Sequence, residues 1–107
     1  MVQMIDEKYE EVVMGLIVSS GDARSLAMEA IQAAKAKAFD KANALMAECE
    51  IALTKAHNIQ TELIQKEIRG EHVQIMLLMV HAQDHLMNAI VVKEMAMEII
   101  ELHHKIE

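Results

Sequence analysis

Residues 73–100 read VQIMLLMVHAQDHLMNAIVVKEMAMEII, and this stretch decides the fold. Every residue from Val73 to Val80 except Gln74 is apolar, so no face of this segment is left for water. Apolar residues then recur at helical spacing as far as Ile106. We therefore expect a long helix over residues 73–106 that is buried on more than one side.

Two apolar seams run along this expected helix, about one residue out of phase. One seam contains Leu77, Val80, Asp84, Met87 and Val91, and the other contains Met76, Met79, Gln83, Leu86 and Ile90. A three-helix monomer buries one stripe per helix, so the surplus predicts that the chain self-associates through its third helix. If the Asp84 seam lines a symmetry axis, the carboxylates that meet there need shared protons or a hard cation such as Mg²⁺ or Ca²⁺. The alternative is that Asp84 pairs with a neighbouring side chain on the outside of the bundle.

Two further helices are expected upstream of this stretch. Apolar residues recur at helical spacing from Val12 to Ala33 and from Ala42 to Ile64. The first helix should start near residues 4–6, where acidic side chains suit the positive end of a helix dipole, and should contain a local irregularity at residues 19–21. The sequence therefore predicts one all-α domain over residues 1–107.

Short turns should join these helices. The first turn is expected around residues 37–40, with Phe39 as an anchor and Asp40 as the N-cap of the second helix. Gly70, in EIRGEHV, is expected to end the second helix. Because short loops join antiparallel neighbours, the expected fold is an antiparallel three-helix bundle with up-down-up topology.

The composition excludes several classes of protein. The chain of 107 residues carries a net charge of −7 and has no basic cluster, so it is not expected to bind nucleic acid. No run of about 18 apolar residues predicts insertion into a membrane. The single cysteine, Cys49, excludes an internal disulfide framework and is expected to be a small buried apolar residue. No secretory signal opens the chain, which favours a cytoplasmic location.

Two of the six histidines form a candidate site. His81 and His85 are four residues apart and share a helix face, which is a metal-ligand spacing, but neither HExxH nor CxxC completes a zinc set. An exposed imidazole can instead accept a phosphoryl group, with Gln83 and Asn88 as hydrogen-bond donors. A satisfied core histidine remains the alternative.

Three other histidines are expected to be structural or solvated. His103 and His104 fall in the last helical turn, where a cation suits the helix C-terminus. His72 is expected to open the third helix.

Three blocks of the chain resemble one known family. They are VVMGLIVSSGDARSLAMEAI, KAHNIQTELI and LLMVHAQDHLMNAI, in that order. The family is the IIA subunits of the lactose/cellobiose/N,N'-diacetylchitobiose class of the bacterial phosphoenolpyruvate-dependent sugar phosphotransferase system. The resemblance implies that His81 is the phosphoryl acceptor. It also implies a homotrimer of nine helices in which Asp84 of each chain binds Mg²⁺ or another divalent cation on the axis.

The resemblance also implies partners and supporting residues. The histidine phosphocarrier HPr would phosphorylate His81, which would pass the group to a cysteine of the cognate IIB subunit during uptake and phosphorylation of a disaccharide. Gln83 and His85 are candidates for orienting the phosphate or the imidazole. His57 and Gln60 match an AHxxQ pattern, and their role stays open between a packing contact and a wall of the site.

Two alternative functions compete with this interpretation. One is a non-catalytic, metal-stabilised helical oligomer. The other is a two-component histidine phosphotransfer domain, but such domains typically carry a Lys and a Gly shortly after the histidine, and HAQDHLMN has neither. The chain also departs from the family in its turns, because KAKAFDKA lacks the usual glycine and RGEH is shorter than in several relatives.

Overall fold

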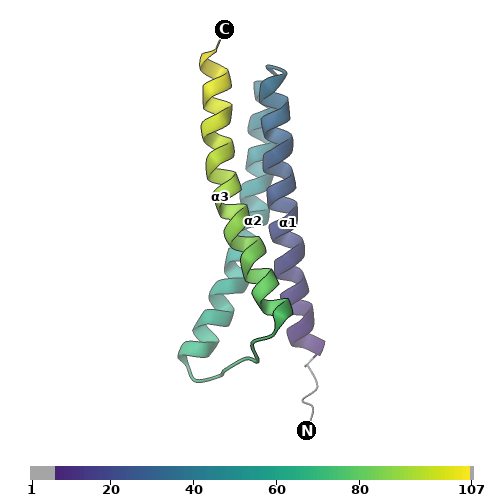
Figure 1. Ribbon diagram of the computed structural model, residues 1–107, viewed down its shortest axis with the longest axis vertical. Coiled ribbons are helices and arrows are strands. Elements are labelled where there is room, and N and C mark those ends of the chain that lie inside the picture. Colours follow the sequence, from purple (N-terminus) through teal and green to yellow (C-terminus); the bar gives the residue numbers. More distant parts are fainter. Residues whose placement is uncertain (1–6, 107) are drawn as a thin grey trace.

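The computed structural model describes residues 7–106 and contains three helices. These are α1 (Glu7–Lys35), α2 (Phe39–Ile68) and α3 (Leu77–Lys105). They form a rod with extents of 63 × 23 × 17 Å, in which α1 and α3 run in one direction and α2 in the other (Figure 1). The all-α, up-down-up bundle is thus confirmed. The expected start of the first helix at residues 4–6 lies outside the described residues.

Small side chains on α1 let the helices approach closely. Ala23 and Ala27 are fully buried, and the larger Leu16 and Leu86 lie in the same core cluster. The helix is continuous across residues 19–21, where the sequence predicted an irregularity. Both serines of that stretch are buried in the bundle. Packing against α2 and α3 therefore keeps α1 helical where its intrinsic propensity is low.

The first turn is built on Lys37, which adopts a φ of 62°. Ala38 N–H donates to the Ala33 carbonyl at 2.9 Å, and Lys37 N–H donates to the Ala34 carbonyl at 3.0 Å, which is the Schellman pattern. The Lys37 ammonium donates to the carbonyls of His103 and Ile106 at 2.9 and 2.7 Å, so the turn also caps the end of α3.

The expected N-cap of α2 was wrong. Ala38 occupies the N-cap position without a side-chain hydrogen bond, and Asp40 lies in the first turn of the helix. Because the backbone of Lys37 is left-handed, the N-cap of α2 is residue 38, two residues earlier than the sequence suggested. Phe39 is an anchor as expected, because it packs on the core and its ring stacks on His104 with centroids 4.2 Å apart.

The second turn confirms Gly70 as the residue that ends α2. Its φ is 86°, its N–H donates to the Glu67 carbonyl at 3.0 Å, and Glu71 N–H donates to the Lys66 carbonyl at 2.9 Å. A backbone with this φ favours glycine because a Cβ atom would be strained there.

The third helix begins later than predicted, at Leu77, so the expectation of a helix from Val73 was wrong. Residues 71–76 are non-helical and cross the end of the bundle (Figure 1). The Tyr9 hydroxyl donates to the Gln74 carbonyl at 2.8 Å, and Val73 packs on the core. These contacts hold the segment extended in spite of its helical pattern. His72 therefore lies exposed in this connection and does not open α3.

The two seams of α3 have different environments. In the seam that contains Met79, Leu86 and Ile90, the side chains are buried or half-buried in the core. In the other seam, Leu77 leaves 84 % of its surface exposed, and Val80, Met87 and Val91 are exposed too.

No helix within residues 7–106 combines the length and hydropathy needed to cross a membrane.

Candidate functional site

His81 and His85 lie one turn apart near the N-terminal end of α3. His81 is exposed and His85 is half-buried. Their Nε2 atoms are 3.0 Å apart, and the two rings meet edge to face with centroids 4.4 Å apart. At this distance one Nε2 carries a proton and the other offers a lone pair. The pair thus fixes the orientation of both rings and links their tautomers.

Asp84 is exposed and lies within the exposed apolar seam of α3. Asn88 donates to its Oδ2 atom at 3.3 Å, a weak contact at i,i+4 spacing. Among residues 7–106, no three His, Cys, Asp or Glu side chains gather where they could hold a metal ion. A cation at Asp84 would therefore need carboxylates from other copies of the chain.

Gln83 faces the other side of α3. Its Oε1 accepts a hydrogen bond from Gln60 of α2 at 2.6 Å, and its Nε2 contacts the Met79 sulfur at 3.6 Å. At about 100° per residue, Gln83 lies roughly 200° around the helix from His81. Within one chain, Gln83 thus bonds to α2 and is not brought to the ring of His81. The same contact makes Gln60 a cross-helix hydrogen-bond donor.

His57 is not brought to the histidine pair. It is exposed on α2 and lines a hollow of about 210 Å³ together with Glu50, Thr54 and Ile90. Close by, Lys93 of α3 forms a salt bridge with Glu50. The sequence analysis did not identify this pair, because opposite charges on different helices give no local signal.

Cys49 is fully buried, as expected. Its thiol donates to the Ala23 carbonyl at 3.1 Å. Burial raises the pKa of this thiol. A buried, protonated thiol is a poor nucleophile, so Cys49 is not a candidate for the phosphoryl acceptor.

Comparisons with known proteins find relatives that match most of the chain. A family model described as "PTS system, Lactose/Cellobiose specific IIA subunit" matches residues 11–104. A lichenan-specific phosphotransferase enzyme IIA component from Bacillus subtilis is 51 % identical over 102 residues, which are 95 % of this chain and 93 % of that protein.

Solved structures give the same result. The crystal structure of the cellobiose-specific enzyme IIA from Bacillus anthracis matches with a TM-score of 0.89 at 48 % identity, covering 98 % of this chain and 93 % of that one. A chitobiose IIA from Escherichia coli, solved in complex with HPr, matches with a TM-score of 0.78 at 47 % identity, covering 90 % of this chain and 93 % of that one. These relatives share both the three-helix fold and most of their length with this chain.

Proposed function

Because this chain belongs to the lactose/cellobiose-specific IIA subunits of the sugar phosphotransferase system, we propose that His81 is the residue that carries its phosphoryl group. The chain is a phosphocarrier component of that system. The observation that carries the choice of residue is the exposed imidazole of His81, oriented by His85 at an Nε2–Nε2 distance of 3.0 Å. No comparable pair links His57, His72 or His104 to another histidine within residues 7–106.

The proposed transfer needs little from the protein beyond position. A lone pair on His81 attacks the phosphorus of a phosphohistidine donor, the new N–P bond forms in line with the bond that breaks, and the donor imidazole leaves with the electron pair. If His81 donates its Nε2 proton to His85, the lone pair on its Nδ1 is free to attack; in the other tautomer the Nε2 lone pair accepts the His85 hydrogen bond and can attack only when that bond is released. In either case the His81 ring is held before the donor arrives.

We propose HPr as the donor and a cysteine of the cognate IIB subunit as the acceptor. The HPr complex of the chitobiose relative supports the first assignment. His81 itself is exposed in the chain, so its ring is accessible to such a donor. We propose a cytoplasmic location and a disaccharide as the sugar that is finally phosphorylated, which the names of the cellobiose and chitobiose relatives support.

We also propose that the chain assembles as a homotrimer through α3. The exposed apolar stripe of this helix continues beyond Val91 to Met95 and Leu102, which leave 55 % and 59 % of their surfaces exposed. Burial of one such side chain removes apolar surface worth about 1.5–3 kcal/mol from water. Three parallel copies of α3 would cover this stripe and give a nine-helix assembly.

A divalent cation, for which Mg²⁺ is our choice, would fit on the axis of this trimer. Asp84 lies in the apolar stripe, and within residues 7–106 its carboxylate makes only the 3.3 Å contact with Asn88, so it has lone pairs left for a ligand. Oxygen ligands suit a hard cation. The ion would neutralise the three Asp84 carboxylates and so stabilise the assembly, while His81 does the chemistry.

Phosphorylation in vitro tests the assignment of His81. Incubation with phosphoenolpyruvate, enzyme I and HPr should add one phosphate per chain, labile in acid and stable in base. The His81→Ala variant should remain unlabelled, whereas His72→Ala, which alters an exposed histidine of the connection, should be labelled like the parent chain. Labelling of His81→Ala would disprove the assignment.

A further inference from the structure

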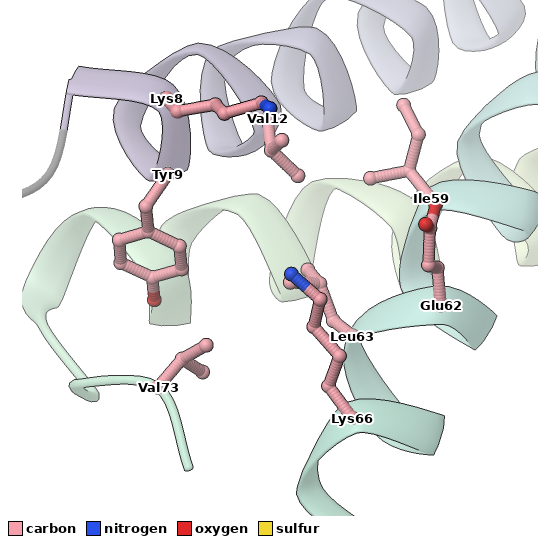
Figure 2. A pocket seen from close by; sticks show the side chains of 8 residues that line it. All are labelled: Lys8, Tyr9, Val12, Ile59, Glu62, Leu63, Lys66 and Val73. Atoms are coloured by element: carbon pink, nitrogen blue, oxygen red, sulfur yellow. The ribbon is translucent and has the colours of Figure 1, made fainter. Parts of the chain in front are cut away.

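A cleft of about 320 Å³ lies where α1 and α2 separate at one end of the bundle. Val12 of α1, Ile59 and Leu63 of α2, and Val73 of the connection form its apolar surface. Figure 2 shows Val12 facing the α2 side chains across the cleft, with Val73 on a third side. Its lining residues come from α1, α2 and the connection, so a trimer formed through the α3 stripe would leave these residues outside that contact.

The wall next to Val73 is fixed by a hydrogen bond. The Tyr9 hydroxyl donates to the Gln74 carbonyl at 2.8 Å and so ties the connection to α1. Burial raises the pKa of Tyr9, which keeps the phenol protonated. The cleft is thus closed on this side by an ordered contact. The phenolic oxygen keeps lone pairs that can accept a hydrogen bond.

The polar side chains of the cleft favour an anion. The charged side chains that line it are Lys8, Lys66 and Glu62. Figure 2 shows the Lys66 ammonium reaching up from α2 toward the space between the helices. No hydrogen bond or salt bridge within residues 7–106 engages that ammonium.

We propose that this cleft binds a small amphipathic carboxylate, with its apolar chain against Val12, Leu63 and Val73 and its carboxylate on Lys66. The single unengaged ammonium of Lys66 matches a monocarboxylate better than a phosphate monoester, which carries about two negative charges near neutral pH. Liquid water occupies about 30 Å³ per molecule, so 320 Å³ holds roughly ten heavy atoms. An eight-carbon acid is of that size.

Octanoate is a suitable probe for a titration of the ¹⁵N-labelled full chain. The amide signals of residues 8–12, 59–66 and 73 should shift. Lys66→Gln should weaken binding roughly fivefold, as expected for a partly exposed ion pair. The matched control Lys55→Gln removes an exposed lysine from the same helix, about 16 Å away, and should bind like the parent chain. Octan-1-ol should bind as weakly to the parent chain as octanoate binds to Lys66→Gln.

A second variant separates this site from general surface binding. Val12→Phe adds a ring at a position that is 36 % exposed, so it should fill the cleft and abolish binding while the helical circular dichroism is retained. His81→Ala should bind octanoate normally, because the cleft does not depend on phosphotransfer. Shifts confined to the α3 stripe, or equal affinity of the parent chain and Lys66→Gln, would overturn the proposal.

Discussion

His81 and His85 meet through the same atom of each ring, with their Nε2 atoms 3.0 Å apart. The contact makes His85 the nearest group that can hold the His81 ring or donate to a phosphoryl group on it. Replacing His85 by alanine should slow phosphoryl acceptance roughly ten- to a hundredfold, the range of a hydrogen bond to a charged group.

The matched variant for this test is His85→Gln, which keeps a side-chain N–H donor of similar reach. It should retain more of the rate than His85→Ala, as measured by rapid-quench labelling with phosphorylated HPr. Equal rates for the two variants would mean that the donor is unimportant.

Gln60 and Gln83 should contribute to stability more than to chemistry. Their 2.6 Å hydrogen bond joins α2 to α3, and Gln83 points away from His81. Gln60→Ala should lower the free energy of unfolding by about 1 kcal/mol and change the rate of phosphoryl acceptance by only a few fold. Urea denaturation and labelling kinetics measure the two effects. A hundredfold loss of rate without loss of stability would instead make Gln60 a wall of the phosphoryl site.

Asp84→Leu should leave the trimer intact or make it more stable. Replacing a buried charged cluster by packed apolar side chains is often neutral or stabilising by about 1–4 kcal/mol. Thermal unfolding and sedimentation equilibrium would detect the change. Dissociation of the variant to monomers, at concentrations where the parent chain stays associated, would contradict the axial position of Asp84.

Metal removal gives a matched test of the same site. A chelator should lower the melting temperature of the parent trimer, because a ligand that binds the native state stabilises it. The chelator should have no effect on Asp84→Leu. An equal effect on the melting temperatures of both proteins would mean that the cation does not bind at Asp84.

The expected and observed folds differ where residues distant in sequence meet. Apolar spacing was enough to predict α1, α2 and α3, since each helix buries one continuous face. It could not show that Val73 leaves the helical pattern, because the Tyr9 bond to Gln74 holds that segment from the other end of the chain. It found the first turn around residues 37–40 but could not show which residue is the N-cap of α2, because Lys37 takes a backbone conformation that usually signals glycine.

The candidate site was predictable to a similar extent. The spacing of His81 and His85 was enough to predict that their rings share a face. Both seams of α3 are apolar, so periodicity could not say which one faces the core. The hydrogen-bond partner of Gln83 could not be predicted either, because Gln60 lies 23 residues away along the chain.

Lys37 should affect stability in two ways, through its bonds to the end of α3 and through its left-handed backbone. Lys37→Ala loses the bonds to His103 and Ile106 and keeps the unfavourable φ of 62°, so it should destabilise the protein by about 1 kcal/mol or more. Lys37→Gly loses the same bonds but relieves the backbone, so it should be closer to the parent chain. Melting temperatures of the two variants make the comparison. If the variants melt together, backbone strain at this turn is negligible.

Burial of Cys49 predicts a pH dependence. Its pKa is raised in the folded state, so above the usual thiol value of about 8.5 the native protein binds more protons than the unfolded chain. Stability should therefore fall as the pH rises through this window. Urea midpoints at pH 7.5 and 9.5 measure the slope, and Cys49→Ala should reduce it. A slope unchanged by that substitution would assign the effect to other groups.

The arrangement of the rod also decides where a label can be attached. His81 lies in the first two turns of α3, and the helix continues for 24 residues to Lys105, a distance of about 36 Å. The end of α3 lies beside the α1–α2 turn, at the pole opposite to the residues 71–76 connection (Figure 1). A fluorophore or reporter domain fused after α3 would therefore lie well clear of His81, and such a fusion would suit single-molecule observation of partner binding.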